Sequence, residues 1–144
     1  MPLRRVLVVC TGNSCRSQMA EAIINTKRSD QWQAFSAGSH PEHAVNPNAL
    51  AVLAEIGIRH DYARPQHINE YIGQEFDLVL TVCDQAAEVC PVWPGQARRE
   101  HLGFPDPAKA TGTPEAVLAV YRQVRDNIES RVLPLLDAIV NEGT

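Results

Sequence analysis

One cysteine-containing loop constrains this chain more than any other segment. A β-branched, apolar run, Val6–Val9, leads into Cys10–Ser17, and apolar residues at helical spacing follow as far as Ile24. Such a run is typical of a buried parallel strand. A short polar loop between a strand and a helix can turn successive backbone N–H groups toward one centre. The sequence therefore predicts a strand–loop–helix unit that binds an anion.

Two residues of this loop carry its chemistry. Cys10 is expected at the base of this anion-binding loop, where the field of the helix N-terminus favours thiolate over thiol. Arg16 supplies a planar guanidinium that matches two oxygens of a tetrahedral oxyanion. A cysteine that ends a core strand is most often an inert small hydrophobe, but that interpretation does not explain Arg16. The residues expected to surround the oxyanion are Thr11, Gly12, Asn13, Ser14, Cys15, Arg16 and Ser17.

Length, charge and hydropathy exclude several classes of protein. A chain of 144 residues fits one domain, expected to span residues 1–144. The formal net charge of −4 argues against general binding to nucleic acid. No apolar run approaches the ~20 residues of a membrane span, and the run after Arg5 is too short for a signal peptide. We expect a cytoplasmic monomer with neither nucleic-acid nor membrane partners.

The cysteines and histidines favour redox or nucleophilic chemistry over a metal site. The cytoplasm keeps thiols reduced, so four cysteines there are not expected to form structural disulfides. None of them has the Cys-x2-Cys spacing of a zinc site. The histidines have no ligand spacing either and are expected at the surface or in packing. They are His40, His43, His60, His67 and His101.

Strands alternate with helices along the whole chain. Further strands are expected at Gln33–Gly38, Asp77–Val82 and Arg98–Leu102. Helices are expected from Asn46-Pro47 to Gly57, over Ile68–Ile72, and from Thr113-Pro114 onward, where Pro134 should kink the helix or end its regular bonding. This alternation predicts an α/β fold with one four-stranded parallel sheet and helices on both faces. Ligands of such sheets bind beyond the carboxyl ends of the strands, where both Cys10 and Cys83 belong.

Cys83 and Cys90 form the second signal. On a helix, residues seven apart share a face but lie two turns, or roughly 10 Å, from each other. A disulfide requires Cα atoms within about 7 Å, so this pair can bond only if the helix unwinds or loops out. A redox role therefore predicts a mobile segment. The alternative is two buried cysteines in a short helix.

Asp106 is the third signal. The prolines on both sides of it stiffen the backbone and hold it away from helical geometry. A carboxylic acid held near an oxyanion loop can serve as the general acid for a departing oxygen. Read alone, Asp106 is more often an ordinary polar loop residue.

These motifs resemble a known family. The Cys-x5-Arg-Ser pattern is similar to the active-site loop of low-molecular-weight tyrosine phosphatases and of arsenate reductases that share their fold. Cys10–Glu21, Ser36–Gly38, Asn46-Pro47, Cys83…Cys90-Pro91 and Asp106-Pro107 resemble the thioredoxin-coupled arsenate reductases closely. Nearly the whole chain takes part. Ala108-Lys109 stands where the tyrosine phosphatases usually carry aromatic residues, so a platform for a phosphotyrosine ring is missing there.

The resemblance implies a three-cysteine relay. Cys10 attacks arsenate held by the loop and Arg16, and Asp106 protonates the departing oxygen. Cys83 then attacks Cys10 and releases arsenite. Cys90 next attacks Cys83, which leaves a Cys83–Cys90 disulfide for thioredoxin to reduce. Related enzymes use glutaredoxin or mycothiol instead.

Three further placements follow from the same resemblance. Ser17 is expected to donate a hydrogen bond to Cys10, Asn13 to brace the loop, and Cys15 to point toward the core.

The resemblance does not extend to a cation cofactor. Some family members bind potassium through residues matching Asn13, Glu21, Ser36 and a Thr/Asp pair. Ala63 and Pro65 stand at that pair, and neither side chain can ligate a cation. We therefore expect no potassium site, and Arg64 to pair with Glu21 in its place.

Two other functions remain compatible with the sequence. The first is a low-molecular-weight protein tyrosine phosphatase in which Cys83 and Cys90 are incidental. The second is a non-catalytic sensor that binds an oxyanion or responds to redox changes and signals through the disulfide.

Overall fold

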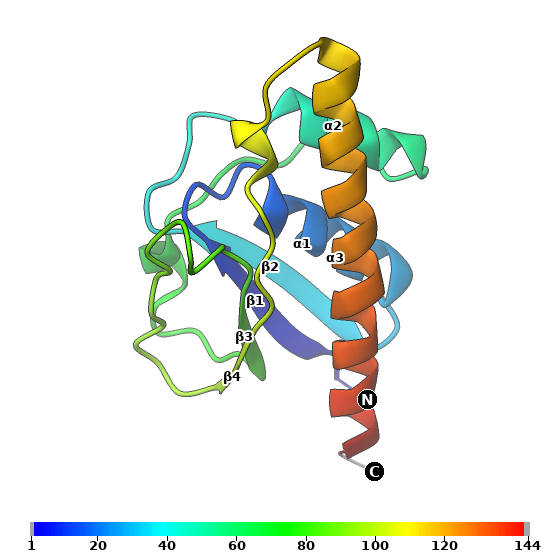
Figure 1. The fold of residues 1–144 in the computed structure, drawn as a ribbon. Helices are drawn as coiled ribbons and strands as arrows, with labels where there is room; N and C mark the ends of the chain where they lie inside the picture. Colours follow the sequence, from blue (N-terminus) through cyan, green and yellow to red (C-terminus); the bar gives the residue numbers. More distant parts are fainter. Residues whose placement is uncertain (1, 143–144) are drawn as a thin grey trace.

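The apolar run near the N-terminus forms an interior strand, β1 (Arg4–Cys10), of a four-stranded parallel sheet (Figure 1). The computed structural model describes residues 2–142. Its other elements are α1 (Arg16–Lys27), β2 (Trp32–Gly38), α2 (Pro47–Glu55), the 3-10 helix η1 (Ile68–Tyr71), β3 (Leu78–Thr81), β4 (Arg98–His101), the 3-10 helix η2 (Pro107–Lys109) and α3 (Pro114–Glu142). The strand order is β2-β1-β3-β4, and every pair is parallel. The predicted α/β fold is confirmed.

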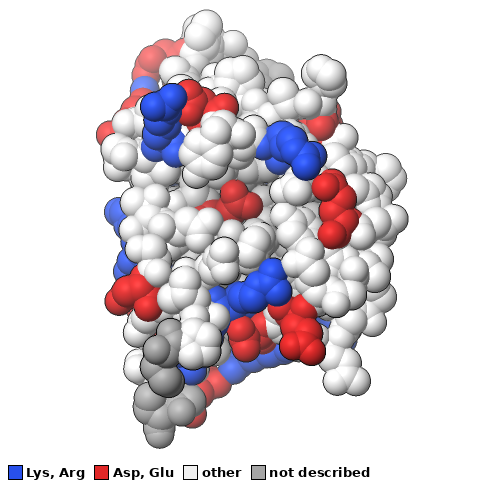
Figure 2. All heavy atoms as spheres, turned by 180° about the vertical axis from the view of Figure 1, so that it is seen from behind, with Lys and Arg blue, Asp and Glu red and all other residues white. Residues whose placement is uncertain are grey.

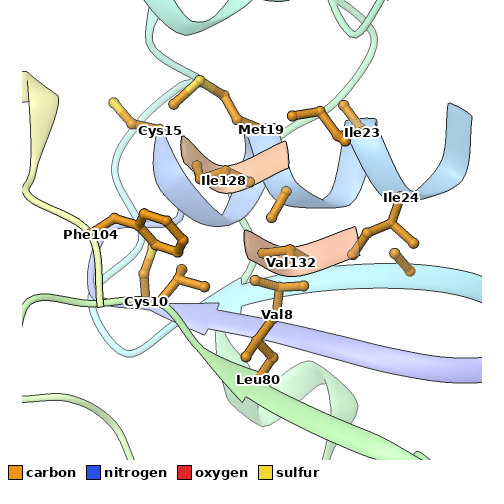
Figure 3. Packing of buried hydrophobic residues seen from close by; sticks show 14 of the residues in the cluster. Val8, Cys10, Cys15, Met19, Ile23, Ile24, Leu80, Phe104, Ile128 and Val132 are labelled. Carbon is orange, nitrogen blue, oxygen red and sulfur yellow. The ribbon is translucent and has the colours of Figure 1, made fainter. Parts of the chain in front are cut away.

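Side chains of β1 alternate between two apolar clusters, one on each face of the sheet. Val6 and Val8 pack beneath α1, α2 and α3, whereas Leu7 and Val9 pack beside η1 and Trp93. Figure 3 shows Val8 under the side chains of α1 and α3. Helices therefore lie on both faces, as predicted, with the three α-helices on one side and η1 on the other.

The predicted helix signals have the expected physical basis. The Asn46 side chain accepts a 2.9 Å hydrogen bond from the Asn48 backbone N–H at the start of α2. Gly57, just beyond that helix, has a φ of +79°. The Thr113 hydroxyl accepts a 3.1 Å bond from the Ala116 N–H at the start of α3. Pro134 does not end α3, which continues to Glu142.

Charges are mixed on the side of the molecule seen from behind. Figure 2 shows basic and acidic side chains interleaved there with neutral ones. Within residues 2–142, no helix combines the length and apolar character that crossing a membrane requires.

The end of β2 supports the cysteine loop directly. Gly38 pairs with Cys10 across the sheet, and its N–H donates a 2.9 Å hydrogen bond to the Gln66 carbonyl. A Cβ at Gly38 would lie 2.3 Å from the backbone oxygen of Thr11. Because real Cβ atoms do not approach an oxygen this closely, the absence of a side chain at Gly38 allows the loop to rest on β2.

Gly38→Ala should therefore displace the loop, lower the stability by roughly 2 kcal/mol or more, and weaken binding of phosphate or sulfate. Gly57→Ala is the matched control, since open space surrounds Gly57 and its strained φ costs only about 1 kcal/mol. Urea unfolding and anion titration of both variants measure the two effects. Unchanged anion affinity in Gly38→Ala would show that the loop does not depend on this contact.

Candidate active site

The thiol of Cys10 lies at the centre of the loop. Cys10 is buried at the end of β1, and its Sγ accepts a 3.3 Å hydrogen bond from the backbone N–H of Asn13. The Ser17 Oγ lies 2.9 Å from the same sulfur. Asn13 has a φ of +51°, a left-handed conformation that asparagine tolerates better than most residues. This turn folds the loop back over the sulfur.

The direction of the Ser17 hydrogen bond follows from its neighbours. The Asn13 side-chain amide donates to Ser17 Oγ at 2.7 Å and to Ser36 Oγ at 2.9 Å. The Ser17 oxygen is thus an acceptor toward Asn13, which leaves its own hydrogen to donate to Cys10. Both residues have the contacts that the family resemblance implied. Ser17 contacts the Cys10 sulfur, and the Asn13 side chain braces the loop.

Arg16 begins α1 and faces the same pocket. Its side chain is 4% exposed, and its Nη1 donates a 3.2 Å hydrogen bond to the Phe104 carbonyl. No side chain caps α1 within the described chain, so its first-turn N–H groups remain open to an anion beside Arg16. The guanidinium and the helix N-terminus thus lie together, as an anion site at this loop would require.

The carboxyl group of Asp106 lies near the Arg16 guanidinium. Its Oδ1 accepts a 3.0 Å hydrogen bond from the Ala108 N–H and caps η2, which fixes the carboxyl group. Its Oδ2 is 3.9 Å from Arg16 Nη2. Asp106 and the loop residues 10–16 line one pocket, whose outer wall includes His40, Glu42 and His43. A carboxyl group in this position can reach an oxygen of a bound oxyanion.

Cys83 and Cys90 are joined by a disulfide, with their Cα atoms 5.9 Å apart. The segment between them is a series of turns and bends and not a regular helix. This agrees with the expectation that the two cysteines can bond only where the segment departs from helical geometry, and it does not fit the alternative of two buried cysteines in a short helix. Cys10 and Cys15 are free thiols.

Cys83 lies at the same sheet edge as Cys10. The N–H of Val82 donates a 3.0 Å hydrogen bond to the Val9 carbonyl, which brings the residues after β1 and β3 together. Cys10 and Cys83 belong to one buried cluster. The prediction that both cysteines lie at one edge of the sheet is confirmed.

Cys15 points into the core, as expected. Its sulfur lies 3.7 Å from the Tyr121 hydroxyl, and burial raises the pKa of its thiol to about 11. A thiol that stays protonated and buried is a poor nucleophile. Cys15 therefore has a packing role, distinct from that of Cys10.

A buried polar layer lies under the loop. Ser36 Oγ donates to Glu21 Oε1 at 3.1 Å, and His60 Nε2 is 3.6 Å from Glu21 Oε2. The Gln18 amide links His60 to Asn13, with distances of 2.8 and 3.1 Å. Sequence reasoning placed His60 among surface or packing residues and did not foresee this network.

The expected Arg64–Glu21 pair does not form. Arg64 is largely exposed, and its Nη2 lies 3.6 Å from Glu70. His60 is the basic side chain nearest Glu21 instead. The residues Asn13, Ser36 and Glu21 satisfy one another by hydrogen bonds, and Ala63 and Pro65 offer no side-chain ligand, so the residues present do not fit a potassium ion.

Glu88 is the site residue that sequence reasoning missed. Its carboxylate forms a bidentate ion pair with Arg16, at 2.5 and 2.9 Å. The sequence signal that could have identified Glu88 was an acidic residue between two cysteines, one of them expected at the same sheet edge as the loop that contains Arg16. That signal was not decisive, because a helical segment would point Glu88 elsewhere.

Glu21 should make the stability depend on pH. Burial raises its pKa to about 7, above the ordinary value of 4.5, and burial lowers that of the neighbouring His60. Between pH 4.5 and 7 folded Glu21 binds more protons than unfolded Glu21, so its contribution to stability should fall as the pH rises through this range. The lowered pKa of His60 acts in the opposite sense below its ordinary value of 6.5. Glu21→Gln should remove this fall, with a difference of up to roughly 3 kcal/mol at pH 8. Urea unfolding of both proteins at several pH values measures it, and parallel profiles would contradict the assignment.

Comparison with known proteins places this geometry in a family. The family model for the low molecular weight phosphotyrosine protein phosphatases matches residues 5–144. The arsenate reductase of Halalkalibacterium halodurans is 47% identical over 127 residues, which cover 88% of this chain and 91% of the relative.

Solved structures agree with this. The crystal structure of an Archaeoglobus fulgidus arsenate reductase aligns with a TM-score of 0.71 at 33% identity and covers 92% of this chain and 98% of its own. An arsenate reductase in its oxidized state aligns with a TM-score of 0.78 at 28% identity, covering 95% and 99%. The chain thus belongs to the low molecular weight phosphotyrosine protein phosphatase family, in the group formed by its arsenate reductases.

Proposed function

We propose that this protein reduces arsenate to arsenite through a relay of three cysteines. The observation that carries the proposal is the Cys83–Cys90 disulfide beside a free Cys10 under an oxyanion loop. A phosphatase needs the loop but has no use for this second pair of cysteines. The curated relatives named as arsenate reductases support the same activity.

The first step uses the loop and the two polar residues around it. The Cys10 thiolate attacks the arsenic atom, while Arg16 and the loop N–H groups hold the remaining oxygens. Asp106 gives its proton to the departing hydroxyl group of arsenate, which leaves as water. The product is a covalent Cys10–arsenate adduct in which arsenic is still pentavalent.

The second step reduces arsenic and forms a Cys10–Cys83 disulfide, and the third step replaces it with the Cys83–Cys90 disulfide. The Cys83 thiolate attacks the Cys10 sulfur, a disulfide forms between them, and the pair of electrons from the breaking S–As bond reduces arsenic to arsenite. The Cys90 thiolate then attacks Cys83 and frees Cys10 as a thiolate. The disulfide in the structure corresponds to the end of this sequence.

The resulting disulfide needs an external dithiol, and we propose thioredoxin. Cys83 is fully buried, whereas Cys90 is half-buried and the nearby Val89 and Val92 are exposed. An incoming thiolate therefore reaches Cys90 before Cys83. We also propose that the protein acts as a monomer in the cytoplasm, the compartment in which reduced thioredoxin keeps thiols reduced.

The decisive assay is NADPH oxidation by the purified protein with thioredoxin and thioredoxin reductase. Sustained consumption should begin when arsenate is added. Hydrolysis of an aryl phosphate without arsenate-dependent consumption would instead indicate a phosphatase. Formation of one disulfide per chain, with no further turnover, would indicate a sensor.

Cys83→Ser should reduce thioredoxin-dependent arsenate turnover by roughly a hundredfold or more, because the adduct on Cys10 meets no second thiol. Hydrolysis of a small aryl phosphate should persist, since it needs only Cys10, Arg16 and Asp106. Cys15→Ala is the matched control, a buried cysteine outside the relay that should keep both activities. Full arsenate turnover by Cys83→Ser would exclude the relay.

Asp106→Asn should slow both arsenate reduction and aryl phosphate hydrolysis by roughly a hundredfold, because both lose the proton donor for the departing oxygen. The loss should be smaller for substrates with a good leaving group, which leave without protonation. Initial rates on aryl phosphates of graded leaving-group pKa measure this dependence. An equal loss across the series would assign Asp106 a structural role.

A further inference from the structure

The carboxylate of Glu88 occupies the position of an anion in the loop. Its Oε1 accepts hydrogen bonds from Thr11 Oγ1 at 2.6 Å and Arg16 Nη2 at 2.9 Å. Its Oε2 accepts from Arg16 Nη1 at 2.5 Å and the Asp84 N–H at 3.0 Å. Each carboxylate oxygen therefore has two donors, and three of these four bonds come from the residues of the oxyanion site.

This ion pair is well shielded and specific. The Arg16 side chain is 4% exposed and that of Glu88 is 14% exposed. Burial by itself would raise the pKa of Glu88, but the hydrogen bonds from Arg16, Thr11 and Asp84 outweigh it and lower the pKa to about 2. Glu88 is therefore an anion throughout the neutral range.

An oxyanion would compete for the same donors. A carboxylate and two oxygens of a tetrahedral oxyanion match the guanidinium fork in the same bidentate way. The two N–H groups of Arg16 that face Glu88 cannot serve both anions at once. Full engagement of arsenate or phosphate thus requires Glu88 to leave.

The position of Glu88 depends on the conformation of residues 83–90, which the disulfide joins into a ring. The N–H groups of Ala87 and Glu88 both donate to the Asp84 carbonyl, at 3.0 and 2.9 Å, in a turn inside the ring from Cys83 to Cys90. If residues 83–90 were helical, Glu88 would be rotated by roughly 140° from Cys83 about the helix axis. A helical segment that presents Cys83 to Cys10 therefore turns Glu88 away from Arg16.

We propose that Glu88 is a built-in ligand of the oxyanion site, which it fills when the Cys83–Cys90 disulfide has formed. The oxidised protein then excludes oxyanions until the disulfide is reduced. The inference rests on the proposed relay, because it gives the disulfide a place in the reaction cycle. Glu88 acts through Arg16 and is a positioning residue. By reciprocity, an oxyanion in the site favours reduction of the disulfide.

Isothermal titration with inorganic phosphate tests this directly. The dissociation constant is measured for the oxidised protein and for the protein reduced with dithiothreitol. The wild type should bind phosphate at least about tenfold more weakly when oxidised, the size of coupling that bistable sites usually show. In Glu88→Gln, the oxidised form should gain affinity until the two states differ by less than about threefold, while the reduced form stays unchanged.

Glu42→Gln is the matched control. Glu42 is exposed on the wall of the same pocket, whereas the carboxylate partners of Arg16 in the described chain are Glu88 and Asp106. Removing the Glu42 charge should affect both redox states equally and leave their affinity ratio as in the wild type. An effect as large as that of Glu88→Gln would mean general electrostatic repulsion and overturn the proposal.

A second measurement does not depend on any variant. The wild type is equilibrated with a dithiothreitol redox buffer, with and without saturating phosphate. Phosphate should raise the ratio of reduced to oxidised protein by the factor that separates the two dissociation constants. Equal phosphate affinity in both states, with no shift of this ratio, would overturn the proposal. Neither measurement involves arsenate or thioredoxin, so failure of the NADPH assay would count against the relay alone.

Discussion

The parallel pairing of β1 with β2 and β3 is the constraint on which the whole site depends. This register ends three chain segments at one sheet edge and delivers Cys10, Gly38 and Cys83 there. Each then turns differently, one into the oxyanion loop, one under it and one into the disulfide segment. Chemistry that needs residues 73 positions apart is thereby built from strands a few ångströms apart.

The elements with strong local signals could be predicted from the sequence. The β-branched run of Val6–Val9, the Asn46 cap and the Thr113 cap each depend on neighbouring residues only, so their elements appear within a few positions of the expected bounds. Cys10, Arg16 and Asp106 line one pocket for a different reason, since the parallel topology carries them to a common edge. Pro134 proved tolerable inside a long helix whose apolar side packs against the core.

The remaining features depend on contacts that no local pattern encodes. Cys83 and Cys90 have helical spacing, but residues 83–90 form turns and bends within the disulfide ring, and there Glu88 contacts Arg16. Likewise, Glu21 and His60 are 39 positions apart in sequence, and their approach follows from how α1 packs against the chain beyond α2. Long-range polar networks of this kind are decided by burial and mutual hydrogen bonding, which a periodicity in sequence does not record.

The three cysteines of the relay differ in their exposure to solvent, and this difference affects how readily each can be oxidised irreversibly. Cys10 and Cys83 are at most 2% exposed, and Cys90 is half-buried. Thiolates in contact with solvent are the ones that peroxides convert irreversibly to sulfinic and sulfonic acids. In this structure the most exposed sulfur of the three, that of Cys90, is already held in a disulfide, a form that a dithiol can reduce and that is protected from irreversible oxidation.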